Sequence, residues 1–198
     1  MSTSLVHRLA AAAGVAGAAV LLVNTAKRAG ILPANAVTQL VAPLAQVMAL
    51  MLVLALFARV GSRAGHFGLI AFVLNVTALT LLVGVEFVLN LVFPRLDSAT
   101  VTDLRAGPLG VMLVIASMTF LTGTVLFAAS LWRTGGPPRP ALVLYVAGAV
   151  PVALRAAVPE AALQLGLLAF AVAVGWLSVW LWSDATQDAR TTAGLERV

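Results

Sequence analysis

The chain contains no cysteine, only two histidines and few charged residues. Of its 198 residues, 10% are Asp, Glu, Lys or Arg, and 62% are hydrophobic. The absence of cysteine excludes disulfides, thiolate catalysis and cysteine-bound metals. Because His7 and His66 lie outside the long apolar runs, haem ligation by paired histidines inside a membrane is excluded as well. We expect neither a metal nor another cofactor.

Motifs that name a reaction are also absent. The sequence has no Walker A loop, no H-E-x-x-H pair and no G-x-S-x-G nucleophile setting. The Gly-Ser-Arg-Ala-Gly segment at residues 61–65 is typical of a tight turn and does not match a phosphate cradle. Nucleotide hydrolysis and proteolysis therefore have no support in the sequence.

What the chain has in abundance is apolar surface, and this defines its class. A soluble domain carries about 25% charged residues and cannot bury so many apolar side chains. The net charge of +5 comes from basic residues scattered singly or in pairs between apolar runs, so we expect no binding of nucleic acid. We predict an integral membrane protein in contact with the lipid bilayer.

Glycine, proline and charged residues divide the chain into apolar runs, which predict an all-α bundle of about six transmembrane helices. We expect residues 1–182 to form this domain and residues 183–198 to form a polar C-terminal tail. The first run also fits a signal peptide, but Lys27 and Arg28 directly after it favour an uncleaved span. The predicted spans are residues 9–26, 37–58, 67–93, 109–132, 141–158 and 161–182.

The basic residues between the spans predict the orientation. With a cytoplasmic N-terminus, seven of them face the cytoplasm and five face the other side, which favours cytoplasmic termini. Arg greatly outnumbers Lys, and Ala and Val are abundant, as in GC-rich bacterial genomes. We therefore expect a multi-pass protein of the bacterial inner (plasma) membrane. Ala10, Gly14 and Ala18, at four-residue spacing on the first span, permit close helix contacts and a homodimer.

Glu86 is the most informative single residue, because it lies inside the 27-residue apolar run from Phe67 to Phe93. A carboxylate in hydrocarbon costs about 2.5–3.5 kcal/mol on insertion scales. It persists where it faces the protein interior, finds a partner or stays protonated. Asn75, Glu86 and Asn90 share one helix face, since eleven or four steps of about 100° return to nearly the same direction. We expect this face to point into the bundle, with both asparagines orienting Glu86.

Other polar residues are candidates for the same site. Arg155 ends the fifth span and Glu160 begins the sixth, so both lie on the membrane side that holds Glu86 in any six-span arrangement. Arg155 pairs with Glu86 or with Glu160, or extends to the lipid headgroups, and the sequence leaves these alternatives open. Polar residues on further spans that could join the site are Gln39, Gln46, Ser117 and Thr124.

The connection at residues 94–108 is the longest between any two spans. Within it, Ser98 to Ala106 fit a short surface helix that begins at Asp97 or Ser98 and ends at Gly107. Such a helix is either a solvated connector or a lid over a pocket.

A local resemblance suggests a chemistry. Val85-Glu86-Phe87-Val88, followed by Leu91-Val92-Phe93-Pro94, resembles the aromatic-Glu-hydrophobic stretch of small integral-membrane terpene cyclases. The resemblance implies that a membrane-embedded acid protonates an epoxide or olefin of a prenylated substrate. It covers about ten residues, Val85 stands where the family has an aromatic residue, and a second acid has only Glu160 and Asp184 as late candidates. The whole chain also resembles uncharacterised six-helix membrane proteins of actinobacteria, which implies no function.

We predict an intramembrane pocket around Glu86 for an isoprenoid or lipidic small molecule. Burial favours a neutral carboxyl group, which can donate a proton to a weak base and so start a cyclisation. Two other functions stay open, a non-catalytic membrane partner or assembly protein and a small-solute or proton-coupled transporter. The predicted catalytic residue is Glu86, and the predicted substrate-binding residues are Asn75, Asn90, Phe87, Arg155 and Glu160.

Overall fold

The computed structural model describes residues 3–195, with side chains described for residues 5–187. Within this part of the chain every regular element is a helix. A π-helical turn, η1, and a 3-10 turn, η2, follow the longest helix. The elements are α1 (Thr3–Arg28), α2 (Ala36–Val41), α3 (Leu44–Phe87), η1 (Val88–Val92), η2 (Phe93–Arg95), α4 (Ser98–Ala106), α5 (Pro108–Thr134), α6 (Arg139–Ala153) and α7 (Glu160–Leu195).

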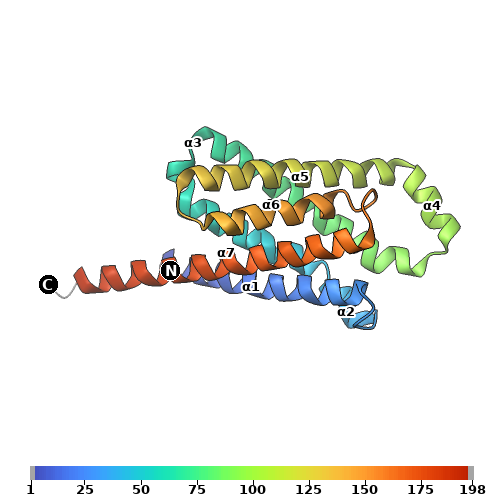
Figure 1. The fold of residues 1–198 in the computed structure, drawn as a ribbon, viewed down its shortest axis with the longest axis horizontal. Helices are drawn as coiled ribbons and strands as arrows, with labels where there is room; N and C mark the ends of the chain where they lie inside the picture. Colours follow the sequence, from blue (N-terminus) through green and yellow to red (C-terminus); the bar gives the residue numbers. More distant parts are fainter. Residues whose placement is uncertain (1–2, 196–198) are drawn as a thin grey trace.

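The helices run up and down in one bundle (Figure 1). Four apolar stretches are long enough to cross a membrane, and the stretch Ala36–Arg95 has 60 residues. A straight helix of that length would measure about 90 Å, whereas the hydrocarbon core of a bilayer is about 30 Å thick. The chain instead turns back inside α3 at Gly65, whose φ of 59° and ψ of −163° are open only to glycine. The two arms of α3 therefore count as two passes, and α6 adds a shorter sixth, which confirms the predicted all-α bundle.

Among the helix bounds that differ from the predicted spans, those of α6 and α7 have a clear physical cause. The fifth predicted span continues to residue 158, whereas α6 ends at Ala153. Pro151 supplies no backbone N–H, so the helix loses a hydrogen bond in its last turn. The last predicted span ends at residue 182, whereas α7 continues to Leu195, so the predicted polar tail begins inside this helix. Residues 183–193 contain neither glycine nor proline, and helix hydrogen bonds form regardless of side-chain polarity.

The largest contacts between the long helices form a ring. Helix α1 contacts α7 and α3, α7 contacts α6, α6 contacts α5, and α5 contacts α3. Gly14 of α1 faces Ser178 of α7, and Ala10 and Ala18 on the same side are buried. The small-residue face that we expected to permit a homodimer is thus occupied by α7 of the same chain.

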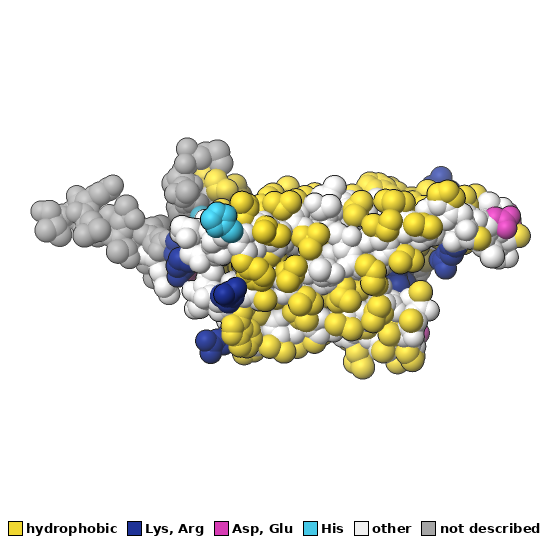
Figure 2. Space-filling view, turned by 90° about the horizontal axis from the view of Figure 1, so that it is seen from above, with side chains coloured by type: hydrophobic (Ala, Val, Ile, Leu, Met, Phe, Trp, Pro, Cys, Tyr) yellow, Lys and Arg dark blue, Asp and Glu magenta, His cyan; other side chains and the backbone are white. Residues whose placement is uncertain are grey.

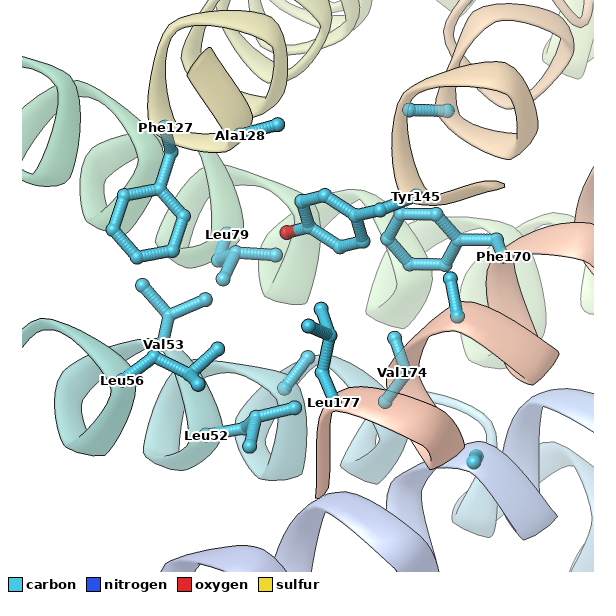
Figure 3. Packing of buried hydrophobic residues seen from close by; sticks show 14 of the residues in the cluster. Leu52, Val53, Leu56, Leu79, Phe127, Ala128, Tyr145, Phe170, Val174 and Leu177 are labelled. Carbon is cyan, nitrogen blue, oxygen red and sulfur yellow. The ribbon is translucent and has the colours of Figure 1, made fainter. Parts of the chain in front are cut away.

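The core is filled by aliphatic and aromatic side chains from all the long helices (Figure 3). Tyr145 of α6 stacks on Phe170 of α7, with ring centroids 4.9 Å apart. Phe120 of α5 meets Phe170 edge-on at 5.7 Å. Lipid tails are as apolar as leucine, so burial from water does not hold membrane helices together; close packing does.

The outer surface matches a bilayer. Hydrophobic side chains cover the middle of the bundle, and charged side chains lie toward its two ends (Figure 2). At the end with the two termini, the Arg8 guanidinium lies 4.7 Å from the ring centroid of Trp182. Arg139 lies in the same way over Trp132, at 5.2 Å. Tryptophan with a neighbouring cation is typical of the membrane–water interface.

Candidate functional site

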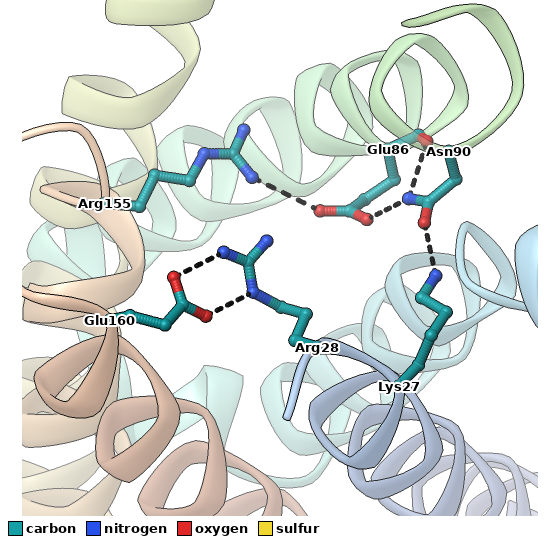
Figure 4. Close-up of polar contacts among 6 residues, drawn as sticks. All are labelled: Lys27, Arg28, Glu86, Asn90, Arg155 and Glu160. Carbon is teal, nitrogen blue, oxygen red and sulfur yellow. Dashed lines mark hydrogen bonds and ion pairs between the residues drawn. The ribbon is translucent and has the colours of Figure 1, made fainter. Parts of the chain in front are cut away.

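The polar site lies at the end of the bundle opposite the termini. Four parts of the chain meet there (Figures 1 and 4). They are the last turn of α1, the end of α3 with η1, the short helix α4 and the connection between α6 and α7. Glu86 comes from the last turn of α3.

A change of helix type positions Asn90 against Glu86. The α-helical hydrogen bonds of α3 give way to a π-helical turn at Val88–Val92, directly before Pro94. Proline offers no N–H to the preceding turn, so the helix cannot continue regularly through this point. The Asn90 side-chain amide donates to the Glu86 backbone carbonyl at 3.0 Å. π-turns inside helices are frequent at functional sites.

Both carboxylate oxygens of Glu86 have partners, and the side chain is only 14% exposed. Oε2 accepts a hydrogen bond of 2.8 Å from Asn90 Nδ2. Oε1 lies 3.7 Å from Arg155 Nη1. Asn90 Oδ1 in turn accepts a hydrogen bond of 2.7 Å from Lys27 Nζ. An acid in the membrane-embedded part of the chain is thus held by a guanidinium and, through one amide, by an ammonium (Figure 4).

Glu160 belongs to a second ion pair beside the first. Arg28 Nε and Nη2 donate to its two carboxylate oxygens at 3.2 and 3.0 Å. This two-bond geometry matches the fork of a guanidinium to a carboxylate. The sequence left open whether Arg155 pairs with Glu86, pairs with Glu160 or extends to the lipid headgroups. In the structure Glu160 pairs with Arg28, and Arg155 pairs with Glu86.

A cavity of about 1150 Å³ opens beside these ion pairs. This volume lies just above the range of roughly 300–1000 Å³ that is usual for small-molecule pockets. Phe120 and Phe170, both buried, close it toward the core, and Val114 and Met118 of α5 give its rim an apolar edge. Its charged lining residues are Lys27, Arg28, Glu86, Arg105 and Arg155.

One face of α4 forms part of the cavity wall. Residues Ser98, Val101, Thr102 and Arg105 line it, and these positions repeat every three or four residues along the helix. The helix begins and ends where the sequence predicts, with Asp97 as the N-terminal cap and Gly107 directly after it. Helix α4 is therefore more than a solvated connector, since it covers one side of the cavity.

The cap of α4 predicts a pH dependence. The backbone N–H and the hydroxyl of Thr100 donate to the Asp97 carboxylate at 2.9 and 2.7 Å, and these hydrogen bonds hold the pKa of Asp97 below its usual value. The cap therefore stabilises α4 fully at a pH above the pKa of about 3.9 that Asp97 has in the unfolded chain. This stabilisation is lost as the pH falls through the lower pKa of Asp97 in the folded protein. Thr100→Val should raise the pKa of Asp97 in an NMR titration. Thr102→Val should leave the pKa of Asp97 unchanged, because the Thr102 hydroxyl donates to the Ser98 backbone carbonyl instead.

The structure gathers some predicted site residues and separates others. Glu86, Asn90 and Arg155 line the cavity, and Glu160 borders it through Arg28. Phe87 is 48% exposed and does not line the cavity. One step along a helix turns a side chain by about 100°, so Phe87 points away from the face that carries Glu86, and its predicted role in substrate binding stays a prediction.

Asn75 lies too deep to orient Glu86. It is on the same helix face, but eleven residues correspond to about 16 Å along the axis. Asn75 is fully buried, and its amide makes no hydrogen bond. The Thr124 hydroxyl of α5 is buried beside it, and the Tyr145 side chain is the polar group that lies close to both. Of the two predicted orienting asparagines, Asn90 is the one that contacts Glu86 in the structure.

The sequence reasoning missed three of the cations at the cavity. Lys27, Arg28 and Arg105 had been counted as loop charges that set the membrane orientation. Their signal was weak, because a basic residue at a helix end is ordinary in membrane proteins. Of the polar residues on further spans that could join the site, Gln39, Gln46 and Ser117 line the cavity, whereas Thr124 does not.

Asp184, one candidate for a second acid, lies at the other end of the bundle, where its carboxylate pairs with Arg59. Among the residues that the structure describes, no group of three His, Cys, Asp or Glu side chains converges as metal ligands would. The site is thus an acid held among cations beside an apolar cavity. No family model matches this chain, and no curated protein or solved structure is significantly similar to it. The class that the fold defines is a multi-pass helical membrane protein.

Proposed function

We propose that this protein binds an isoprenoid or another lipidic molecule in the cavity beside Glu86. One observation carries the proposal: a large cavity with an apolar floor and rim reaches a fixed cluster of charged and amide groups. Small-molecule sites usually combine mostly apolar walls with a few convergent polar groups. An apolar molecule dissolved in the bilayer meets such a cavity at its apolar edge on α5.

Acid-initiated cyclisation is the catalytic form of this proposal, with Glu86 as proton donor. It is supported by the contact of Glu86 with the cavity and by the aromatic rings of Phe93, Phe120 and Phe170 in the lining, whose faces suit a developing cation. The ion pair with Arg155 opposes it, because a guanidinium favours the carboxylate over the acid. We therefore propose binding as the function and cyclisation as a reaction to be tested.

Transport is a weaker proposal for this arrangement. A transporter needs a polar path through the bundle, whereas buried Phe120 and Phe170 end the cavity at the packed core. A role as a passive assembly protein explains the ion pairs but leaves the cavity without a use.

A substitution that fills the cavity should remove the ligand. Ser117 of α5 lines the cavity, so Ser117→Trp should reduce the amount of lipidic molecule that co-purifies with the protein several-fold. Ile115 lies on the same helix but outside the lining and is exposed, so Ile115→Trp should retain the ligand. The measurement is mass spectrometry of the organic-soluble molecules from equal amounts of each purified protein. Equal amounts of only bulk phospholipid in all three would contradict the proposal.

The catalytic form makes a separate prediction. Glu86→Gln keeps the shape of the side chain but removes its acidity. If Glu86 donates the proton, the wild type should carry a cyclised compound and the variant its linear precursor, because no other acidic side chain among the described residues lines the cavity. The same mass spectrometry distinguishes the two. An unchanged product from Glu86→Gln would eliminate the proton-donor role and leave the binding proposal intact.

A further inference from the structure

The charges around the cavity are unbalanced, and this bears on what the proposed ligand carries. Lys27, Arg28, Arg105 and Arg155 line the cavity, while Glu86 is the one acidic lining residue in the part of the chain that the structure describes. Even with Glu160 at the border included, four basic side chains face two acidic ones. Asp97 and Asp103 of α4 do not line the cavity, so they do not alter this balance on its wall.

Two of the four cations lack an acidic partner among the described residues. Arg28 and Arg155 each pair with a glutamate. Lys27 donates to Asn90, a neutral amide, and the Arg105 guanidinium lies over the ring of Phe93 at 5.1 Å from its centroid. An amide and an aromatic face hold a cation in place without neutralising it.

These cations also lie close to one another. Glu86 is within electrostatic range of Lys27, Arg28 and Arg155 and attracts all three. Arg155 is also within range of Arg28 and Arg105, and Lys27 is within range of Arg28, so one carboxylate is shared among cations that repel one another. Like charges repel, and the repulsion grows beside a low-dielectric cavity, where water screens it less. A fold that collects such charges around one opening gains stability when an anion occupies the space between them.

We propose that the four basic side chains lining the cavity bind the phosphate group of an amphipathic lipid whose apolar chain occupies the cavity, an inference that rests on the proposed function. A phosphate group carries up to two negative charges, which match the two unpaired cations, and it offers several acceptor oxygens to guanidinium and ammonium donors. The hydroxyl of Ser98 lies on the same face of α4 as Arg105 and supplies a further donor. Two sources have this chemistry, an isoprenyl phosphate and the headgroup of a phospholipid.

Matched lipids test the phosphate group separately from the chain. The probes are geranylgeranyl phosphate and dioleoyl phosphatidic acid, each compared with its uncharged counterpart, geranylgeraniol or dioleoylglycerol. Binding is measured by native mass spectrometry of the full chain in detergent. We expect the wild type to bind the phosphate-bearing member of a pair roughly tenfold more tightly than the uncharged member. The preference between the two phosphates identifies the source.

The double variant Lys27→Gln/Arg105→Gln should lose this preference, because its affinity for the phosphate-bearing lipid should fall toward its affinity for the uncharged one. Thermal unfolding in detergent shows whether the variant is folded. Arg95→Gln is the matched control, because Arg95 lies at the same end of the bundle but outside the lining, and it should keep the preference.

Two results would overturn the inference. One is equal affinity of the wild type for the charged and uncharged lipids, and the other is an unchanged preference in the double variant. If the uncharged lipids bind and Ser117→Trp abolishes that binding, the pocket stands and only the phosphate group is wrong. If no probe binds, or Ser117→Trp changes nothing, the proposed function itself fails.

Discussion

Replacing Arg155 with leucine should destabilise the bundle by roughly 2 kcal/mol, whereas replacing both partners of its ion pair should cost less. Arg155→Leu leaves the Glu86 carboxylate at 14% exposure with only the Asn90 amide against it. An ionic group that loses its partner in a low-dielectric site keeps the full cost of desolvation. The pair is partly exposed, so the expected loss is below the 3–5 kcal/mol typical of a fully buried pair.

Thermal unfolding of the purified protein in detergent measures this difference. In Arg155→Leu the Glu86 carboxylate loses its guanidinium partner. The double variant Glu86→Gln/Arg155→Leu removes this charge as well, so its melting temperature should lie above that of Arg155→Leu. A double variant less stable than the single one would mean that the pair itself, and not the stranded charge, carries the stability.

Gly148→Ala should have a comparable effect on stability through packing alone. A Cβ atom at Gly148 would lie 2.5 Å from the Phe170 backbone nitrogen and 2.7 Å from the Gly166 carbonyl oxygen. Backbone atoms cannot move aside as a flexible side chain can, so α6 and α7 would have to separate. Overpacking of this kind typically costs about 1–3 kcal/mol. Gly84→Ala is the matched control, because a Cβ there meets nothing within 4 Å.

The same thermal unfolding experiment compares the two glycine variants, and a Gly148→Ala protein as stable as Gly84→Ala would contradict the close approach of α6 and α7. The contact also matters for the site. The connection between these helices carries Arg155, and Glu160 begins α7. A shift of α6 relative to α7 should therefore weaken ligand binding together with stability.

Glu86 has a different protonation state in the cyclisation proposal and in the phosphate-binding proposal, and the variant Glu86→Gln distinguishes the two. As an acid, Glu86 supplies the proton that starts a reaction. As a carboxylate, it neutralises Arg155 and so lowers the positive charge of the cavity rim. Glu86→Gln should therefore end any cyclisation while the affinity for a phosphate-bearing lipid stays the same or increases.

The sequence by itself determined the class of protein and the order of its passes. Low charge and long apolar runs exclude a soluble fold, and proline and glycine mark where the chain reverses. Local rules were also sufficient for α4, because Asp97 and Gly107 are capping signals that act within one helical turn. The shared end of Glu86, Arg155 and Glu160 follows from the alternation of six passes alone.

Only the tertiary structure decided the pairing of charges and the existence of the cavity. Lys27 and Asn90 are 63 residues apart, and Arg28 and Glu160 are 132 residues apart, so no local pattern connects them. Helical periodicity gives the direction of a side chain around its own axis, as it did for Asn75 and Asn90, but not what the neighbouring helix presents at that depth. Which face meets which, and where the packing leaves space, depends on helix contacts made across the whole chain.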